Sequence, residues 1–386
     1  MKNCTSIFAQ MLQIVNRTAF ERAVHAHKAE ARCKGFSSWG QFVAMVFAQV
    51  GQAHSLREIG NGLATCMGKL SHLGLKEAPA RSTLSYANEH RPWELFQTVF
   101  EGLLAQCQLI APHHKFRFKN PLYSLDATVI ELCASLFSWA EFRTTKGAVK
   151  MHLLLDHAGY LPTFALITEG KVHESRVAPD VPLAPGSIVA VDRGYNDYEQ
   201  YQRWTDQGVT FVTRGKKNAV YEVVDERLAP ERGNVVSDQT IRVTGYYATR
   251  KCTSLLRLVV VWDDRKEEPV ALWTNNFKLG ATTIGRIYKE RWQIELFFKA
   301  IKQHLRIKTF VGTSANALKT QIWTALIAVL LVKFLQFKSR IAWSLSNLVA
   351  MLRFNLFSYR DLWAWLKDPF GVPVVEPGPV QEEFAF

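Results

Sequence analysis

Two short apolar segments that each carry an aspartate place the strongest constraint on the fold of this chain. Residues 188–191 read IVAV and are followed directly by Asp192, and Asp126 lies inside the strand-like segment YSLDATV. Segments that are apolar at nearly every position suit strands that are buried on both faces of a sheet. A carboxylate is costly to bury there, so it is expected to be paired, bound to a metal ion or placed at a strand end that faces a cleft. Either acid by itself could equally be a structural residue at a strand end.

A third acid, Glu295, lies in residues 287–308, IYKERWQIELFFKAIKQHLRIK, which contain no Gly or Pro and predict one helix. With a turn of about 100° per residue, Glu295 shares a narrow stripe with three other polar residues. These are Tyr288, Arg291 and Lys302. The stripe borders an apolar seam, which places it at the edge of a buried face. A surface helix stabilised by ion pairs at i,i+4 is the alternative interpretation.

Asp126, Asp192 and Glu295 together form a set of hard oxygen ligands, which Mg²⁺ and Mn²⁺ prefer. Two such ions about 3.5–4 Å apart can activate a water or a 3′-hydroxyl and stabilise the leaving oxygen in phosphoryl transfer. The chain has 47 Lys and Arg against 34 Asp and Glu, a formal net charge of +13. This excess favours an anionic partner, nucleic acid before a membrane surface. The sequence therefore predicts a two-metal catalytic site that acts on nucleic acid.

The remaining pattern divides the chain into helical and β-rich stretches. Residues 1–115 predict helices, strand-like segments follow, and residues 193–280 are again β-rich. Asp156 stands in DHAGYLP, whose turn residues predict a hairpin rather than a catalytic acid. The chain is helical and apolar over residues 315–366 and ends in a proline-containing segment that predicts an extended arm.

Two predicted helices near the N-terminus could read DNA. Ser55 and Glu58 form a capping box at the start of SLREIGNGL, and Ser82 is positioned to cap a second helix. The second helix would have Arg81 at its mouth and polar side chains along one face. These side chains are Ser85, Asn88 and Arg91. A helix, a turn and a second helix of this kind suit a DNA-reading element, and they suit an ordinary helical bundle equally well.

Two further features are candidate DNA contacts. The segment RGKKN supplies Arg214, Lys216 and Lys217 directly after a predicted strand. It predicts a basic loop that contacts the DNA backbone, although a solvated turn has the same composition. Trp292 flanks the helical stripe, where it could stack on an unpaired base or pack into the core.

Cysteine usage and hydropathy favour a cytoplasmic protein. The six cysteines lie far apart without metal-ligand spacing, which favours reduced thiols. The N-terminal segment MKNCTSIFAQML lacks the apolar core and cleavage site of a signal peptide. The run ALIAVLLVKFLQF is too short to span a bilayer and contains Lys333, so it predicts a buried helix. No membrane partner is expected.

The acidic motifs also carry a family resemblance. The segments LDATVI and VDRGYND, and the spacing Y-(2)-R-(3)-E-(6)-K, resemble DDE insertion-sequence transposases of the YREK-signature class, insertion-sequence family four. The spacing is met by Tyr288, Arg291, Glu295 and Lys302. The long gap between Asp192 and Glu295 is similar to the gap that holds a β-strand insertion within the RNase H-like core of this class. The resemblance covers roughly residues 120–345.

The resemblance implies cut-and-paste DNA transposition, in which Asp126, Asp192 and Glu295 would ligate Mg²⁺ or Mn²⁺. It implies nicking of a transposon end, a hairpin intermediate and joining to target DNA, with Tyr288, Arg291 and Lys302 holding phosphates. The expected partners are double-stranded DNA, as terminal inverted repeats and as target, and a second copy of the chain in a synaptic dimer. The expected location is the prokaryotic cytoplasm, in association with the nucleoid.

Two other functions remain open. A DNA-binding repressor derived from a transposase would need the same basic surface without metal chemistry, but the intact acids argue against it. Another RNase H-like metal nuclease would share the acids, but the Y-R-E-K spacing and the helical N-terminal region favour the transposase.

The resemblance implies an α/β fold with an RNase H-like mixed sheet and flanking helices, interrupted by a β-rich insertion and preceded by an all-helical domain. The expected division is a helical DNA-binding domain in residues 1–115, the first part of the core in 116–192, the β-rich insertion in 193–280, the second part of the core in 281–345, and a helical segment with a tail in 346–386.

Overall fold

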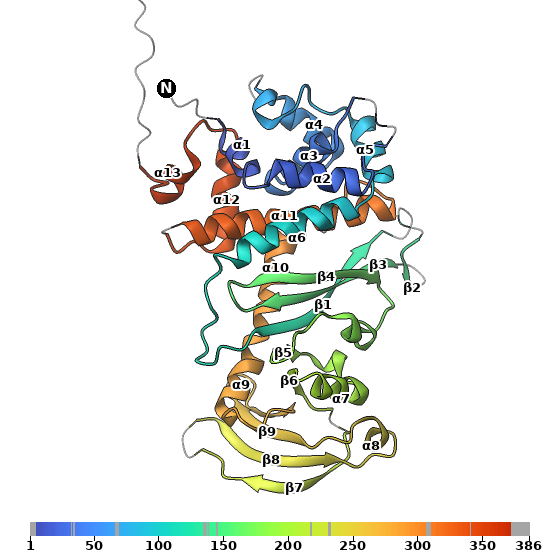
Figure 1. Cartoon of the computed structure of the whole chain (residues 1–386), viewed down its shortest axis with the longest axis vertical. Coiled ribbons are helices and arrows are strands. Elements are labelled where there is room, and N and C mark those ends of the chain that lie inside the picture. The colour runs from blue at the N-terminus through green and yellow to red at the C-terminus, as the bar shows by residue number, and fades with distance from the viewer. Residues whose placement is uncertain are drawn as a thin grey trace, which may run out of the picture.

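The computed structural model describes residues 5–371 except 32, 34, 66–68, 134–136, 138, 144–145, 217, 231–232, 306–309 and 340. Figure 1 shows an elongated molecule: helices from both ends of the chain gather at one end, a sheet occupies the middle, and further strands continue to the other end. The predicted class, an α/β chain with a mixed sheet and flanking helices, is confirmed. The predicted C-terminal arm falls mostly outside the described residues.

Five strands form the centre of the sheet. They are β1 (Leu122–Leu132), β3 (Lys146–Asp156), β4 (Leu161–Glu169), β5 (Ile188–Val191) and β6 (Thr210–Arg214). β1, β3 and β4 form an antiparallel meander, and β5 lies parallel to both β1 and β6. All four residues of β5 are buried, as an apolar strand covered on both faces requires. The short strand β2 (Glu141–Arg143) pairs with the start of β3.

The β-rich stretch extends this sheet. Its strands are β7 (Tyr221–Arg227), β8 (Val235–Val243), β9 (Leu256–Asp263) and β10 (Glu268–Thr274). β10 pairs with β6, and β9, β8 and β7 follow outward, with β7 almost wholly exposed. The stretch predicted as β-rich, residues 193–280, also contains helix α7 (Tyr198–Asp206) and the short helix α8 (Ala248–Lys251). It includes the strand β6 as well, which belongs to the centre of the sheet.

A buried ion pair ties this extension to the helices that follow. Arg257 donates to the two carboxylate oxygens of Asp238 at 2.8 and 2.7 Å. The same guanidinium donates to the backbone carbonyls of Asn276 and Leu279 at 3.1 and 2.6 Å. Arg257, a buried residue of β9, therefore holds the segment between β10 and the next helix in place.

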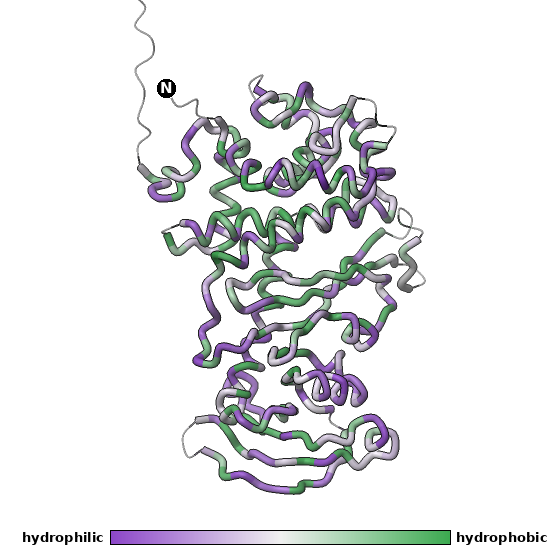
Figure 2. Tube along the Cα trace, in the orientation of Figure 1, coloured by the Kyte–Doolittle hydropathy of each residue, from purple (hydrophilic) through white to green (hydrophobic). Residues whose placement is uncertain are grey.

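The long helix α11 (Ala315–Lys338) is the centre of the helical end. It packs against α3 (Ser38–Val50) and α6 (Glu94–Gln108), and Figure 2 shows how apolar it is. The buried helix predicted around Lys333 is confirmed, and the Lys333 ammonium donates to the carbonyl of Gly159 at 2.9 Å. The helix is longer than the apolar run suggested, and in length and composition it could cross a membrane, but 89% of its apolar window is buried inside the protein.

Shorter helices complete this end of the molecule. They are α1 (Ile7–Leu12), α2 (Arg17–Ala26), α4 (Leu56–Ala64), α5 (Arg81–His90), α12 (Leu345–Asn355) and α13 (Leu362–Lys367). The 3-10 helices along the chain are η1 (Leu70–Leu73), η2 (Glu174–Arg176), η3 (Ala178–Asp180) and η4 (Arg193–Tyr195). Among the described cysteines, Cys33, Cys107 and Cys252 are free thiols.

The Ser55 cap of α4 is confirmed, with Glu58 reaching back to the residue before the cap, but the prediction for α5 was partly wrong. The Ser55 hydroxyl accepts the Glu58 N–H at 3.2 Å, and the Glu58 carboxylate accepts the His54 N–H at 2.9 Å. Helix α5 begins at Arg81, one residue before the predicted cap Ser82. Two side chains expected on its polar face are buried instead, because that side of α5 packs towards α3: Asn88 accepts a hydrogen bond from Gln41, and Arg91 donates to the carbonyl of Ser37.

Two helices stand where one was predicted over residues 287–308. They are α9 (Ala281–Glu290) and α10 (Trp292–His304), and they meet at Arg291. The backbone at this junction has the hydrogen bonds of a 3-10 turn, which join residues three apart. The Arg291 N–H donates to the Tyr288 carbonyl, and the Ile294 N–H donates to the Arg291 carbonyl. The end of the predicted helix lies outside the described residues.

Candidate active site

The two aspartates are neighbours because their strands pair in parallel. β1 and β5 are paired up to Leu125 and Val191; the residues that follow are Asp126, still within β1, and Asp192, directly after the end of β5. Asp126 also lies opposite Leu153 in the antiparallel ladder to β3, and its Oδ1 accepts the Ala127 N–H at 2.8 Å. Asp192 is half-buried at the point where β5 gives way to η4. Strand pairing therefore places the two carboxylates on neighbouring interior strands, at the point where β5 ends.

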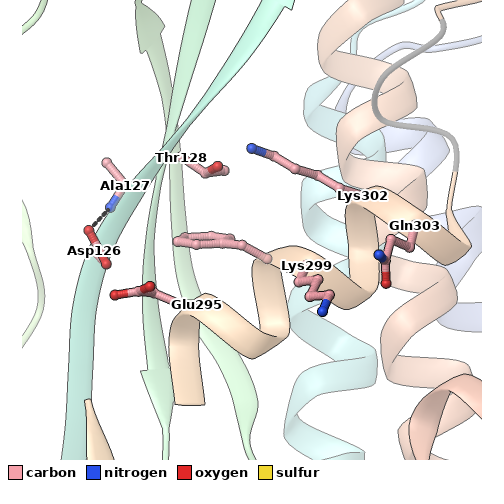
Figure 3. A pocket seen from close by; sticks show the side chains of 8 residues that line it. Asp126, Ala127, Thr128, Glu295, Lys299, Lys302 and Gln303 are labelled. Carbon is pink, nitrogen blue, oxygen red and sulfur yellow. Dashed lines mark hydrogen bonds between the residues drawn. The ribbon is translucent and has the colours of Figure 1, made fainter. Parts of the chain in front are cut away.

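Helix α10 brings the third carboxylate to the same place, with Arg291 between them. The Arg291 guanidinium donates to Asp126 Oδ2 at 3.0 Å and to Glu295 Oε1 at 2.8 Å. Figure 3 shows Asp126 on β1 and Glu295 on α10 pointing toward each other. The Arg291 side chain is only 11% exposed, whereas those of Asp126 and Glu295 are 18% and 35% exposed. Arg291 is thus a largely buried cation that bridges two of the three acids.

The carboxylates influence one another electrostatically. The pKa of Asp126 is raised to about 6, mainly by burial and to a smaller extent by the charges of Asp192 and Glu295, while the Arg291 charge and the Ala127 N–H act to lower it. Three carboxylates face one guanidinium, so the group carries excess negative charge when all are ionised. Such an excess favours binding of a further cation.

A cleft of about 460 Å³ opens beside these acids, between β1 and α10. Lys302 lies in it, as Figure 3 shows, and its ammonium donates to the carbonyl of Val129 on β1 at 3.0 Å. Lys299, Gln303 and Thr128 line the same cleft and were missed from the sequence. Their signal was present: Lys299 and Gln303 follow Glu295 at helical intervals of four, and Thr128 follows Asp126 by two on the strand.

Three other predicted site residues, Tyr288, Arg214 and Trp292, do not line this cleft. Tyr288 is half-buried with the Arg291 guanidinium 5.7 Å from its ring centroid, and burial raises its pKa. Arg214, at the end of β6, forms an ion pair with Glu268 at 3.3 Å. The Arg214 charge also acts to lower the pKa of Tyr288, so Arg214 lies on the Tyr288 side of the site. Trp292 is 54% exposed, so the alternative of core packing was wrong.

The basic loop after β6 lies beside a ring cluster. Exposed Lys216 has its ammonium 5.9 Å from the ring centroid of Tyr198, and it lines a narrow pocket with that ring and Trp273. Lys217 lies outside the described residues.

Comparisons with known proteins decide the family. Residues 117–331, more than half of the chain, match the family model described as the transposase DDE domain. The chain belongs to the DDE transposase family. Residues 3–76 match a second model, described as a domain of unknown function (DUF4372). The predicted function, DNA transposition by a metal-dependent enzyme that cleaves DNA, follows from this membership.

Curated relatives agree with this assignment. A Sinorhizobium fredii protein described as a transposase, y4zB, is 31% identical over 296 residues, which are 76% of this chain and 82% of the relative. A Geobacillus stearothermophilus protein described as a transposase for the insertion sequence element IS5377 is 28% identical over 278 residues, 71% of this chain and 72% of the relative. The solved synaptic complex of piggyBac transposase with hairpin DNA has a TM-score of 0.45 and 10% identity, covering 97% of this chain and 84% of that one. A structural similarity at that level supports no inference about the chain described here.

The family implies a divalent metal ion, and the three acids at and beside this cleft are of the chemical type that binds one. Asp126, Asp192 and Glu295 offer only carboxylate oxygens, which are the ligands of Mg²⁺ and Mn²⁺. Within the described ranges no three acidic, His or Cys side chains are gathered closely enough to hold one ion together. Arg291 contributes to this spacing, because its guanidinium stands between Asp126 and Glu295 and donates a hydrogen bond to each. A cation that binds Asp126 must therefore compete with the Arg291 contact.

Proposed function

We propose that this transposase binds the ends of an insertion sequence and cuts and joins DNA in the cleft between β1 and α10. The observation that carries the proposal is that Asp126 and Glu295 line one cleft and share the Arg291 guanidinium, while Asp192 follows β5 beside Asp126. The three acids come from elements far apart in the chain. A chain with a net charge of +13 is also suited to a polyanionic substrate.

The side chains of the cleft divide the chemistry between them. Asp126, Asp192 and Glu295 would hold Mg²⁺ or Mn²⁺, in two ions, as the catalytic ligands. When bound, the ions would activate the attacking hydroxyl and stabilise the leaving oxygen. Arg291 orients the two carboxylates it bridges, and in the presence of DNA its guanidinium is also suited to a phosphate. Tyr288, whose ring centroid lies 5.7 Å from the Arg291 guanidinium, and Lys302 in the cleft would hold the flanking phosphates.

The finer course of the reaction follows the YREK class that the chain resembles. A water oxygen bonds to the scissile phosphorus while the P–O3′ bond breaks, which leaves a 3′-hydroxyl and a 5′-phosphate. The freed 3′-oxygen then bonds to a phosphorus of the opposite strand while the P–O3′ bond of that strand breaks, which closes a hairpin on the element and releases the flanking DNA with a 3′-hydroxyl. A second water bonds to the hairpin phosphorus and its P–O3′ bond breaks, which restores the 3′-hydroxyl of the element. That hydroxyl would finally attack a target phosphorus and displace the 3′-oxygen of the target strand. We propose that the inverted repeats are bound by a dimer, that residues 1–115 supply a DNA-binding domain, and that Trp292 stacks on an unpaired base.

A product assay tests the proposal. The purified chain is incubated with Mg²⁺ and a labelled duplex that carries the inverted repeat flanking its reading frame, and products are separated on a denaturing gel. We expect a nick at the repeat boundary, followed by a hairpin whose strands do not separate. Binding without any cleavage would support a silent repressor, and cleavage of every duplex without strand transfer would support a nuclease.

The basic loop after β6 gives a separate prediction. Replacing Lys216 and Lys217 with Ala is expected to flatten the log–log dependence of DNA affinity on salt by about one to two units, because each phosphate neutralised contributes about 0.9. Fluorescence anisotropy at several salt concentrations measures the slope. Lys266→Ala, an exposed lysine in the β9–β10 turn, is the matched control. An unchanged slope would place both loop lysines away from DNA.

A further inference from the structure

A second polar link joins β1 to the helices, beside the one that Arg291 makes. The Ser124 hydroxyl of β1 lies 2.7 Å from Nε2 of His157, which stands in the β3–β4 turn. Nδ1 of His157 lies 4.0 Å from Oε2 of Glu290, the last residue of α9. The Tyr160 hydroxyl, from the same turn, donates to that oxygen at 3.4 Å. The β3–β4 turn therefore contacts the helix pair one residue before the guanidinium that bridges two of the acids.

The face of β1 that carries Asp126 also carries this link. Ser124 precedes Asp126 by two residues, so both side chains leave the same face of the strand. Leu122, on the same face, belongs to one buried apolar cluster with Ile284 and Ile287 of α9. Figure 1 shows α9 and α10, in orange, one after the other along the sheet. This face of β1 thus meets α9 through apolar packing and the α9–α10 junction through two polar links.

Burial excludes a nucleophilic role for the serine of this link. Ser124 is fully buried and His157 is only 3% exposed, so a substrate cannot reach the hydroxyl. Burial, together with the charge of His114, lowers the pKa of His157 to about 4, so its ring is neutral at pH 7. A neutral ring has one donor and one acceptor, which suits an Nδ1–H that faces Glu290 and an Nε2 that accepts from the Ser124 hydroxyl. The link is thus a neutral polar contact that holds its members in place.

The β3–β4 turn holds Tyr160 in a backbone conformation that side chains rarely adopt. Its φ is 54°, in the left-handed region, and the preceding Gly159 has a φ of 70°. A bulky residue persists in that region only where its surroundings fix it. The ring of Tyr160 packs edge-on to that of His157 with centroids 5.6 Å apart, and its hydroxyl donates to Glu290. The Lys333 ammonium of α11 also holds the turn, because it donates to the Gly159 carbonyl at 2.9 Å.

We infer that Tyr160 and Glu290 are positioning residues for Arg291. They fix the end of α9, and with it the point at which the chain passes into α10, so that the Arg291 guanidinium reaches two carboxylates at once. The junction needs this support because its 3-10 hydrogen bonds have poorer geometry than those of an α-helix. The inference rests on the proposed function, and it gives the β3–β4 turn an influence on the chemistry that acts only through Arg291.

Single-turnover nicking of the labelled inverted-repeat duplex in Mg²⁺, at saturating protein, tests the inference. Tyr160→Phe keeps the ring and the backbone conformation and removes only the hydroxyl. It is expected to slow nicking about tenfold, roughly the effect of losing one hydrogen bond to a charged group. Glu290→Ala should have a similar effect, whereas Glu290→Gln keeps an acceptor for the Tyr160 hydroxyl and should nick at nearly the parent rate. DNA affinity should be unchanged in all three variants. Tyr123→Phe is the matched control, a half-buried tyrosine on the opposite face of β1.

An Arg291→Ala background separates positioning from a general loss of stability. If Tyr160 and Glu290 act through Arg291, then Tyr160→Phe and Glu290→Ala should slow the Arg291→Ala protein no further, because the group that they position is absent. Slowing by the same factor in both backgrounds would overturn the inference. Nicking at the control rate by both variants of the parent protein would overturn it as well.

Hydrogen exchange gives a readout that does not depend on activity. The backbone amides of residues 287–295 are expected to exchange faster in Tyr160→Phe than in Tyr123→Phe, while those of β5 exchange alike, because only the helix junction is released. Exchange at the junction that matches the control would contradict the inference. A parent protein that does not nick would refute the proposed function instead, and exchange would still decide whether the turn holds the junction.

Discussion

Replacing any one of Asp126, Asp192 and Glu295 with its amide is expected to abolish cleavage of end DNA in Mg²⁺ while leaving DNA binding largely intact. Each amide keeps the size of the side chain but removes the negative charge that a divalent ion requires. Because the ions would supply both activation of the nucleophile and stabilisation of the leaving oxygen, loss of one ligand should affect every chemical step. The expected loss is at least about a thousandfold in nicking rate, larger than that for a single positioned donor.

The measurement is single-turnover nicking at saturating protein, with anisotropy on the same duplex to confirm binding. Asp156→Asn is the matched control, since Asp156 is also an acid on a central strand. Its Oδ1 accepts the Ala158 N–H at 2.8 Å in the β3–β4 turn, as the hairpin prediction expected. Near-normal nicking by Asp126→Asn, Asp192→Asn or Glu295→Gln would remove that residue from the metal site.

Apolar patterning predicted much of the core, because burial on both faces of a strand leaves a direct record in sequence. The IVAV segment became β5, and the turn residues around Asp156 became the β3–β4 hairpin. Parallel pairing then brought Asp126 beside Asp192. The sequence could not state that β6 belongs to the same sheet as β5, since its pattern resembles that of the strands after it.

The tertiary contacts of a side chain were harder to predict than the helix face on which it lies. The helical stripe correctly grouped Arg291 with Glu295, but nothing in its period revealed the contact from Arg291 to Asp126, which joins residues 165 apart. For the same reason Asn88 and Arg91 were expected on a solvent-facing surface, although their partners on α3 draw them inward. Helical periodicity tells which side chains share a face, but the neighbour of that face depends on tertiary packing.

Arg291→Ala is expected to reduce nicking about a hundredfold, roughly the effect of losing one preorganised charge contact in a dehydrated site. Its guanidinium holds Asp126 and Glu295 in fixed positions at 3.0 and 2.8 Å, so its loss leaves two partly buried carboxylates without their common cation. Arg291→Lys keeps the charge but cannot bridge two acids in a planar fork, so it should recover only part of the rate. Tyr288→Phe should be milder than either.

If Arg291 were only part of an ion-pair ladder on the helix, its removal would cost about 0.2–0.5 kcal/mol of helix stability and leave the chemistry unchanged. One experiment separates these outcomes: single-turnover nicking and the thermal midpoint are measured together for Arg291→Ala, with Lys289→Ala as a control for an exposed cation two residues away. A folded Arg291→Ala protein that nicks at the control rate would exclude a role in chemistry. A folded protein with slow nicking and normal DNA affinity would show that Arg291 acts on the carboxylates and not on binding, because a guanidinium whose only task was to hold DNA would change the affinity as well.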